Sequence, residues 1–448
     1  MNPLFGLHEY ILDGEPHVFG DRLYLYGSHD EAHGAKYSPG DYVLWSCPVS
    51  DLQDWRCDGV IYRKNQDPAN PDGKLCLYAP DVVEGPDGCY YLYYGLESRD
   101  MISVAKSSVP EGPFEFYGYV RWPEGVDKEA LPDHPYAFDP GLFREGDRVY
   151  LAMGFSVDFA IAGMDLNEKN MRGAYIVELE EDMLTMKHIP VFAVPGCGRG
   201  KGTSFEGHEF LEASSLRKYG DTYCFIYSSQ HQHELCYAAA YNILGPYVYQ
   251  GVLISNAWEN GFRNNWANNH GSTVRIGVDD YVFYHRHTCG TQYSRQACAE
   301  KILFRNGHFE TAEVTCQGIA GDVLPPGSYP AGIACFVCDG DGGSFIPFGA
   351  EPMDTARIEG DNIVNITQST IVFRYFADVQ CVTLHLTDAA DGSVKLYMKG
   401  SLQDESALKH TVRLYGVQHD TDVTLVFSAQ APVILERVEI EGSSHEAL

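Results

Sequence analysis

Residues 13–26 read DGEPHVFGDRLYLY, an acid followed by a Gly-Asp turn and a Tyr-rich apolar run. The same arrangement returns along the chain, each time with an ionisable residue ten or eleven positions before a tyrosine. The pairs are Asp13 and Tyr24, Asp81 and Tyr91, Asp139 and Tyr150, Glu212 and Tyr223, and His270 and Tyr281. Strand–turn–strand units that repeat along a chain are typical of radial β architectures. If the five units are blades around one axis, their ionisable residues occupy equivalent places and converge near that axis.

Short aromatic or alternating runs cut by Gly, Pro, Asp and Asn indicate that strands dominate the rest of the chain. The clearest predicted strands are residues 23–26, 42–46, 90–94, 149–153, 174–177, 223–227, 235–239 and 281–284. Further runs between the repeats, such as 61–63 and 117–120, bring each unit to about four strands, which is the number in a propeller blade. We therefore predict an all-β fold with a five-bladed β-propeller over residues 1–320.

The repeat ends after Tyr284, and a different organisation follows it. Residues 323–343 are rich in Pro and Gly, which is typical of a linker or an edge, and further strands are expected from about Phe345 onward. No ionisable residue precedes these strands at the earlier offset. We predict a C-terminal β-sandwich domain over residues 321–448. It could bind carbohydrate or pack against the propeller, and we favour packing.

Composition restricts the class of partner. The chain has 62 acids against 32 bases and a net charge of −30, which disfavours nucleic acid and anionic membranes. No stretch approaches the ~20 apolar residues of a membrane span. Tyr, with 30 copies, has an apolar ring and a polar tip that suit contact with sugars. A neutral oligosaccharide is the expected partner.

The N-terminal sequence and the cysteine pattern both predict a reducing, intracellular location. The N-terminus lacks a basic segment followed by an apolar run, so we expect no signal peptide and a cytoplasmic location. The 13 cysteines show no pairing pattern and are expected to be reduced. Cys335 and Cys338 form a lone CxxC inside an apolar run, and a buried strand is favoured there over a metal site.

Six segments together resemble glycoside hydrolase family 43, over about residues 5–315. They are DGEPHVFGDRLYLYGSHD (13–30), YAPDV (78–82), FDPGL (138–142), GHEFLEASSLRK (207–218), NNHG (268–271) and FYHR (283–286). The resemblance implies a five-bladed propeller and inverting hydrolysis of arabinose-, xylose- and some galactose-containing glycans. One departure is Asp13-Gly14, where the family often has Asp-Pro.

The resemblance implies that Asp13 is the general base, Glu212 the general acid and Asp139 a third acid that raises the pKa of Glu212 and orients it. An inverting hydrolase uses one protonated and one ionised carboxyl group with a water between the latter and the sugar. A neighbouring negative charge keeps an acid protonated. Taken singly, Asp13 and Asp139 also suit turn caps, but their shared offset favours catalysis. The same offset favours Glu212 over Glu206 and Glu209.

Other residues are expected around the substrate. The resemblance implies that Arg295 reaches sugar hydroxyls, although an Arg in an acidic cleft also serves as a counter-ion. Asp81 is expected to be structural or to contact sugar. The resemblance further implies a structural calcium ion or a water against His270, with no cofactor required; a hydrogen-bonded core histidine is the alternative. The remaining candidates for lining the pocket or stacking on sugar are His29, Asp30, His285, Trp45, Phe155, Trp258 and Trp266.

The leading functional prediction is an exo-acting β-xylosidase or α-L-arabinofuranosidase that releases xylose or arabinofuranose from short plant-derived oligosaccharides. An endo-acting arabinanase or a galactose-releasing enzyme on the same fold is an alternative. A non-catalytic sugar-binding propeller is an alternative of a different class, although binding alone does not need three converging acids. A phosphorylase is disfavoured because no basic phosphate site is evident.

Overall fold

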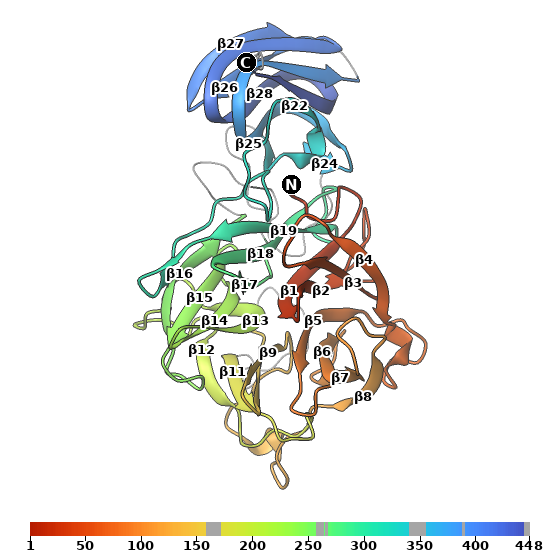
Figure 1. Cartoon of the computed structure of the whole chain (residues 1–448), viewed down its shortest axis with the longest axis vertical. Coiled ribbons are helices and arrows are strands. Elements are labelled where there is room, and N and C mark those ends of the chain that lie inside the picture. The colour runs from red at the N-terminus through yellow and green to blue at the C-terminus, as the bar shows by residue number, and fades with distance from the viewer. Residues whose placement is uncertain (158–171, 257–263, 265–267, 340–354, 388–389, 443–448) are drawn as a thin grey trace.

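The computed structural model describes residues 1–157, 172–256, 264, 268–339, 355–387 and 390–442. Five antiparallel sheets stand around one axis, and a sixth, larger sheet lies beyond the fifth (Figure 1). The predicted all-β class, with a five-bladed propeller followed by a C-terminal β-sheet region, is confirmed. No helix in the described part of the chain is long and apolar enough to cross a membrane.

Each blade is built from strands that follow one another in the chain. Blade one holds β1 (Ile11–Phe19), β2 (Arg22–His29), β3 (Tyr42–Pro48) and β4 (Arg56–Tyr62). Blade two holds β5 (Leu77–Glu84), β6 (Tyr90–Leu96), β7 (Ile102–Ser107) and β8 (Glu115–Tyr119). Blade three holds β9 (Gly141–Glu145), β10 (Arg148–Gly154), β11 (Gly173–Glu178) and β12 (Val191–Pro195). The eight strands predicted most clearly all fall within observed strands.

Blade four holds β13 (Phe210–Tyr219), β14 (Thr222–Ser229), β15 (Leu235–Ala240) and β16 (Val248–Ile254). Blade five holds β17 (Thr273–Ile276), β18 (Asp279–His287) and β19 (Arg295–Ile302). The short hairpin of β20 (Phe304–Arg305) and β21 (His308–Phe309) and the 3-10 turns η1 (Lys64–Gln66) and η2 (Lys128–Ala130) complete the propeller.

The ring is closed by pairing the start of the chain with blade five. The backbone N–H of Leu4 donates to the carbonyl of Ala297 in β19 (2.9 Å), and the side chain of Asn2 accepts from the N–H of Ala299 (3.0 Å). Near the axis, Gly14 pairs with Gly271. The bridge between Gly14 and Gly271 sets β1 beside β17. A Cβ on Gly271 would lie 1.9 Å from the carbonyl oxygen of Phe283 in β18, so glycine is needed for the chain to pass this close to β18.

The tyrosines of the repeat fill the space between the blades. Tyr26, Tyr42, Tyr62, Tyr93 and Tyr94 are fully buried, and several donate their hydroxyl to a partner across the interface. A buried tyrosine needs such a partner because an unbonded hydroxyl in the core is costly. The Tyr-rich runs of the repeat, together with Tyr42 of β3 and Tyr62 of β4, therefore form much of the core between the blades.

The C-terminal region is one hydrogen-bonded sheet with strands β23 (Phe336–Asp339), β25 (Asn362–Leu386), β28 (Thr411–Glu441), β26 (Gly392–Met398) and β27 (Ser401–Ala407) in that order. β22 (Gly327–Pro330) pairs with β28, and β24 (Arg357–Glu359) pairs with β25. Residues 381–385 pair on one side with 411–415 and on the other with 437–441 of the same long strand. The described part of 323–343, predicted to be a linker, thus contains β22, η3 (Ala331–Ile333) and β23. Phe345, where further strands were expected to begin, lies outside the described residues.

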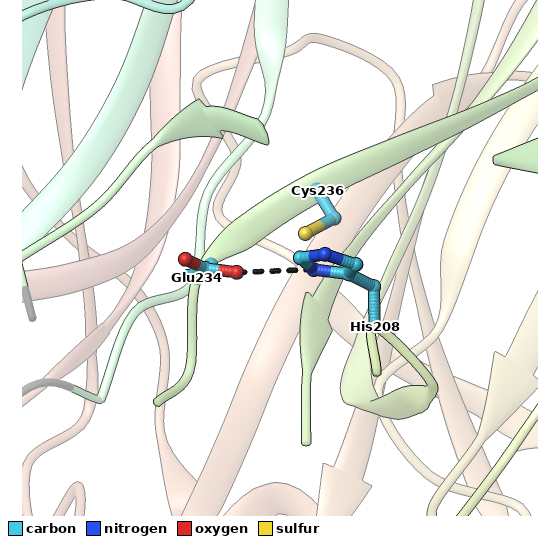
Figure 2. A group of neighbouring side chains, drawn as sticks. All are labelled: His208, Glu234 and Cys236. Carbon is cyan, nitrogen blue, oxygen red and sulfur yellow. Dashed lines mark hydrogen bonds and ion pairs between the residues drawn. The ribbon is translucent and has the colours of Figure 1, made fainter. Parts of the chain in front are cut away.

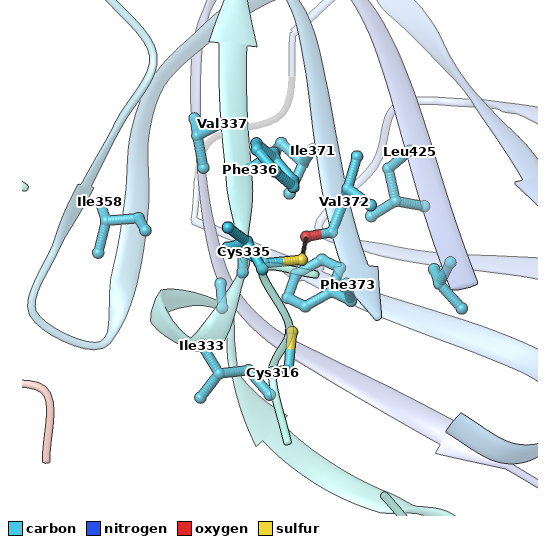
Figure 3. Packing of buried hydrophobic residues seen from close by; sticks show 14 of the residues in the cluster. Cys316, Ile333, Cys335, Phe336, Val337, Ile358, Ile371, Val372, Phe373 and Leu425 are labelled. Carbon is cyan, nitrogen blue, oxygen red and sulfur yellow. Dashed lines mark hydrogen bonds between the residues drawn. The ribbon is translucent and has the colours of Figure 1, made fainter. Parts of the chain in front are cut away.

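The sheet packs directly on the propeller through one hydrophobic cluster. Phe336, Val372 and Leu425 of the sheet share this cluster with Tyr284 and Cys298 of blade five, and its sheet side is seen in Figure 3. Because the cluster spans both parts, the domain boundary at residues 320 and 321 stays a prediction. The favoured packing role of the C-terminal part agrees with this shared core.

Cys335 lies in this cluster just before β23, Cys338 lies within β23, and both side chains are buried. The Sγ of Cys335 donates to the carbonyl of Val372 (3.2 Å), and Cys316 packs near it (Figure 3). All thirteen cysteines lie among the described residues, and none forms a disulfide. The interpretation of the CxxC as a buried strand fits this arrangement.

Candidate active site

The five ionisable residues of the repeat all sit on the first strand of a blade or just before it. Asp13 is in β1, Asp81 in β5 and Glu212 in β13, whereas Asp139 and His270 precede β9 and β17. The backbone is irregular at these places. Asp13 and Asp139 have positive φ angles of 50° and 45°, and the ladders of β1, β5 and β13 are interrupted next to the acids. Such bulges re-aim side chains and concentrate at functional sites.

Three of the acids and the histidine meet in one cavity of about 190 Å³. Asp13, Asp139, Glu212 and His270 line it together with Arg295 and Phe155. The other lining residues are Tyr37, Ser38, Tyr78, Glu97, Ser98, Tyr136, Phe138 and Asn268. The radial arrangement thus gathers four of the five residues of the repeat in one cavity, and the fifth, Asp81, is absent from the described lining.

Asp13 sits among positive and polar groups. Its Oδ1 lies 3.4 Å from Nη1 of Arg295, 3.5 Å from Nδ1 of His285 and 3.7 Å from Nδ1 of His270. Its backbone N–H donates to Nδ1 of His285 (3.5 Å). Arg295 therefore holds one carboxylate oxygen, while His285 accepts the backbone N–H, and the carboxyl group borders the cavity where a water can approach it.

Asp139 is buried and tied to the strand that carries Glu212. Its Oδ2 accepts from the backbone N–H of Ala213 (2.9 Å) and lies 3.7 Å from Nδ1 of His270. Burial raises the pKa of Asp139 well above its usual range, and the charges of Glu212 and Asp13 raise it further. Since Ala213 follows Glu212 directly, the hydrogen bond fixes the backbone from which Glu212 projects.

Glu212 has the properties of a general acid. Burial, and then the negative charge of Asp13, raise its pKa to about 7, against the lowering effects of Arg295 and of a hydrogen bond from Asn268. Asp139 interacts electrostatically with Glu212, since the charge of Glu212 raises the pKa of Asp139. The predicted role of Asp139 in keeping Glu212 protonated stays a prediction, and burial and Asp13 are the main causes of the pKa shift at Glu212 itself.

Asn268, which lines the cavity, and His285, which does not, form a hydrogen-bonded connection between Asp13 and Glu212. Nε2 of His285 lies 2.9 Å from Oδ1 of Asn268, and Nδ2 of Asn268 donates to Oε1 of Glu212 (3.2 Å). Because Nδ1 of His285 accepts from the N–H of Asp13, the proton of the neutral ring is on Nε2. Burial lowers the pKa of His285 well below its usual range, which keeps the ring neutral. His285 is fully buried and does not itself line the cavity, contrary to the expectation from sequence.

Arg295 is held in place by Asp30. Nε of Arg295 lies 2.8 Å from Oδ2 of Asp30 and Nη2 lies 3.1 Å from Oδ1, a bidentate pair. The N–H of Ser38 donates to the same carboxylate (2.8 Å), and the guanidinium lies 4.6 Å above the ring of Tyr37. Burial raises the pKa of Asp30 to about 6 although Arg295 opposes the shift. Asp30 thus positions Arg295, which faces the cavity.

Three further residues predicted to contact sugar are elsewhere. Asp81 is fully buried and accepts from Nε2 of His17, the N–H of Val82 and the N–H of Leu142, each at 2.6 Å, so it links blades one, two and three. Nε2 of His29 lies 3.1 Å from Oε1 of Glu9. The ring of Trp45 stacks on the ring of Phe5, with centroids 4.6 Å apart. Asp81, His29 and Trp45 are absent from the described cavity lining, and Trp258 and Trp266 lie outside the described residues.

Phe155 does line the cavity, beside two aromatic rings that the sequence analysis did not single out. Its ring lies 5.1 Å from Phe138, and Phe138 lies 5.9 Å from Tyr78. Phe138, Tyr78 and Asn268 all lie in segments quoted above for their acids or histidine, so a signal for them was present. Tyr37, Ser38 and Glu97 come from loops that have no such repeat.

The surroundings of His270 were compared with the needs of calcium, which takes six to eight oxygen ligands. The structure sets two carboxylate oxygens, one of Asp13 and one of Asp139, 3.7 Å from Nδ1 of His270. Both oxygens already contact Arg295 or the N–H of Ala213. Burial lowers the pKa of His270, which suits a neutral ring. These donors do not form a protein cage for calcium, and we assign the ion no step in the reaction.

Comparison with known proteins agrees with this geometry. The profile of glycosyl hydrolases family 43 matches residues 16–309. The chain belongs to glycosyl hydrolases family 43. It is therefore a glycoside hydrolase of an inverting family. The matched segment includes every residue of the catalytic cavity named above except Asp13, which lies three residues before it.

Family 43 relatives extend the likeness. A xylosidase/arabinosidase of Thermoclostridium stercorarium is 48% identical over 345 residues, which is 75% of this chain and 71% of that protein. A β-xylosidase/α-arabinofuranosidase from a compost metagenome, solved with xylotriose in a calcium-free form, is 25% identical with a TM-score of 0.55 over 70% of this chain and 97% of that chain. An arabinoxylan arabinofuranohydrolase from Bacillus subtilis, 17% identical, shares the fold over 99% of this chain and 97% of its own, with a TM-score of 0.53.

Proposed function

We propose that the protein is an exo-acting, inverting hydrolase that releases xylose or arabinofuranose from short oligosaccharides. The observation that carries the proposal is the meeting of Asp13, Asp139 and Glu212 in one small cavity beside Arg295. The Thermoclostridium stercorarium relative, a xylosidase/arabinosidase at 48% identity, supports the sugar class.

Glu212 supplies the proton for the leaving oxygen. With a pKa of about 7 it keeps a large protonated fraction near neutral pH. Asn268 donates to Oε1 of Glu212, so Oε1 acts as an acceptor and the proton is carried on Oε2. As the glycosidic bond breaks, that proton passes to the departing oxygen, and Glu212 is left as a carboxylate that regains a proton from solvent.

Asp13 activates the water that attacks the anomeric carbon. In an inverting hydrolase the base takes one proton from a water held between it and the sugar, and the hydroxide oxygen bonds to the face opposite the leaving group. Nη1 of Arg295 lies 3.4 Å from Oδ1 of Asp13 and orients the carboxylate, and Nδ1 of His270 lies 3.7 Å from the same oxygen. The configuration at the anomeric carbon is inverted as a result.

The size and lining of the cavity favour exo action. About 190 Å³ is below the roughly 300–1,000 Å³ of pockets that enclose drug-sized ligands, and it suits one sugar ring. Phe138 and Phe155 offer apolar faces, while Arg295 and the acids offer hydrogen bonds to hydroxyl groups. The expected ligand is the neutral terminal sugar of an oligosaccharide.

The test is a panel of p-nitrophenyl glycosides: β-xyloside, α-L-arabinofuranoside and β-galactoside. Wild-type protein is expected to cleave the xyloside or the arabinofuranoside, with NMR of the first product showing the inverted anomer. Glu212→Gln serves as the inactive control. Cleavage of internal bonds in arabinan without release of monosaccharide would instead identify an endo-acting enzyme. Sugar binding without cleavage of any substrate would identify a binding propeller.

A further inference from the structure

A second group of reactive side chains lies in blade four, apart from the catalytic cavity. His208 is in the turn before β13, Glu234 directly precedes β15, and Cys236 lies within β15 (Figure 2). The potential metal-ligand atoms of the three side chains all lie within 4.8 Å of one another. Nδ1 of His208 is 3.2 Å from Oε2 of Glu234. None of the three lines the cavity that holds Asp13, Asp139 and Glu212.

The cluster is held by buried neighbours on one side and is accessible to solvent on the other. Cys236 is fully buried, and the ring of His208 stacks on Tyr249 with centroids 4.6 Å apart and planes 12° apart. The backbone N–H of Ser229 at the end of β14 donates to the carbonyl of Glu234. The side chains of His208 and Glu234 are 31% and 16% exposed, so an ion in solution can reach them.

The donor types select among metals. Imidazole, thiolate and carboxylate are the three protein ligands of zinc, whereas calcium and magnesium prefer oxygen alone. Zinc bonds to nitrogen and oxygen are about 2.0–2.2 Å long, which places two ligands of a tetrahedral site roughly 3.3 Å apart. The observed 3.2 Å between His208 and Glu234 matches that separation.

We propose that His208, Glu234 and Cys236 form a binding site for one zinc ion. Its fourth position faces solvent. The ion takes the place of the hydrogen bond between His208 and Glu234 and ties the entry of β13, which carries Glu212, to the entry of β15. An ordinary hydrogen bond above a buried thiol is the competing explanation, and it predicts no preference for zinc.

Metal binding to the full chain tests the proposal. Protein freed of metal with a chelator is titrated with ZnCl₂ by calorimetry, and wild type is compared with Cys236→Ser and His208→Gln. Cys57→Ser is the matched control because Cys57 is an exposed thiol in β4. Wild type and Cys57→Ser are expected to bind one equivalent of zinc. The affinity of that equivalent is expected to fall by at least about tenfold in Cys236→Ser and His208→Gln.

Cobalt(II) provides a second readout that does not depend on stoichiometry. A thiolate-to-cobalt charge-transfer band is expected in wild type and Cys57→Ser and is expected to vanish in Cys236→Ser. Turnover of a p-nitrophenyl glycoside by each variant shows that it is folded, since none of these residues lies at the catalytic cavity. Equal zinc affinity in wild type and Cys236→Ser, or the absence of the band in wild type, would overturn the proposal.

Discussion

The first strands of the blades carry buried acids at two levels, one at the cavity and one at Glu15, further along β1. The two levels differ in whether each acid has a positively charged partner of its own. At the cavity, Asp13, Asp139 and Glu212 face one arginine, Arg295, which Asp30 already holds in a bidentate pair. Two residues further along β1, Glu15 is bonded to Arg217 (2.6 Å) and to Ser215 (3.2 Å). The cavity level has an excess of acids, whereas Glu15 has its own cation.

Burial alone does not separate the two levels. It raises the pKa of Glu212 to about 7 and that of Glu15 to about 8. A neighbouring acid raises the pKa in both cases, Asp13 for Glu212 and Asp81 for Glu15. What differs is access, because Glu212 lines the cavity whereas Glu15 is buried against Arg217. A raised pKa therefore indicates a candidate catalytic acid here only when a cavity accompanies it.

The largest expected effect is a loss of stability at Glu15, whose negative charge is paired with Arg217. Arg217→Met removes the cation beside Glu15 and three hydrogen bonds to backbone carbonyls of residues 273, 216 and 16. Loss of one partner of a buried pair costs about 3–5 kcal/mol. Because burial already raises the pKa of Glu15, this group takes up a proton, so we expect the lower end, about 3 kcal/mol of unfolding free energy. The loss should grow as pH rises above about 8, because Glu15 must then ionise without Arg217.

Urea denaturation at several pH values measures this change. Arg413→Met is the matched control, since Arg413 pairs with Glu441 at the surface and half of each side chain is exposed. Exposed pairs of this kind contribute little to stability. If both variants lost the same stability, the pairing of Glu15 would not be what distinguishes this level.

The next effect lies at the cavity. Glu212→Gln and Asp13→Asn are each expected to lower kcat/KM on an aryl glycoside by at least ~10²-fold, the usual contribution of a general acid or base, which corresponds to about 2.7 kcal/mol of transition-state free energy. The Glu212 variant should lose less on a substrate with a very good leaving group. Circular dichroism should show the same fold in both. Full activity in Asp13→Asn would assign the base to another residue.

A smaller effect is expected on the pH profile. Glu212 must be protonated to act, so kcat/KM should fall as pH rises through about 7, the pKa of Glu212. The hydrogen bond from Asn268 stabilises the ionised form and lowers that pKa. In Asn268→Ala the pKa of Glu212 should rise, and the alkaline limb should move to higher pH. A shift to lower pH would show that Asn268 does not stabilise the carboxylate.

The repeat made the residues at the centre of the site predictable, whereas the residues that reach the site from loops could not be predicted. A blade presents one residue of its first strand to the axis, so a constant offset from Asp13 to Tyr24 and from Glu212 to Tyr223 was enough to bring the acids together. Tyr37, Ser38 and Glu97 reach the cavity from connections without any period. Gly and Pro in residues 323–343 suggested a linker, yet β22 and β23 form there because their apolar residues join the shared core. Sequence offsets also gave no measure of how strongly Asp13 and Asp139 each act on Glu212.

The smallest effect tests which aromatic and polar residues contact the sugar. Phe155 lines the cavity, so Phe155→Ala should raise KM by up to about tenfold through loss of roughly 0.5–1.5 kcal/mol of ring contact. His29 contacts Glu9 and is absent from the described cavity lining, so His29→Ala should leave KM within about twofold of wild type. Steady-state kinetics on the best aryl glycoside separate the two variants. An equal rise of KM in both would mean that the sugar extends past the cavity toward β2, and that His29 belongs to a second subsite.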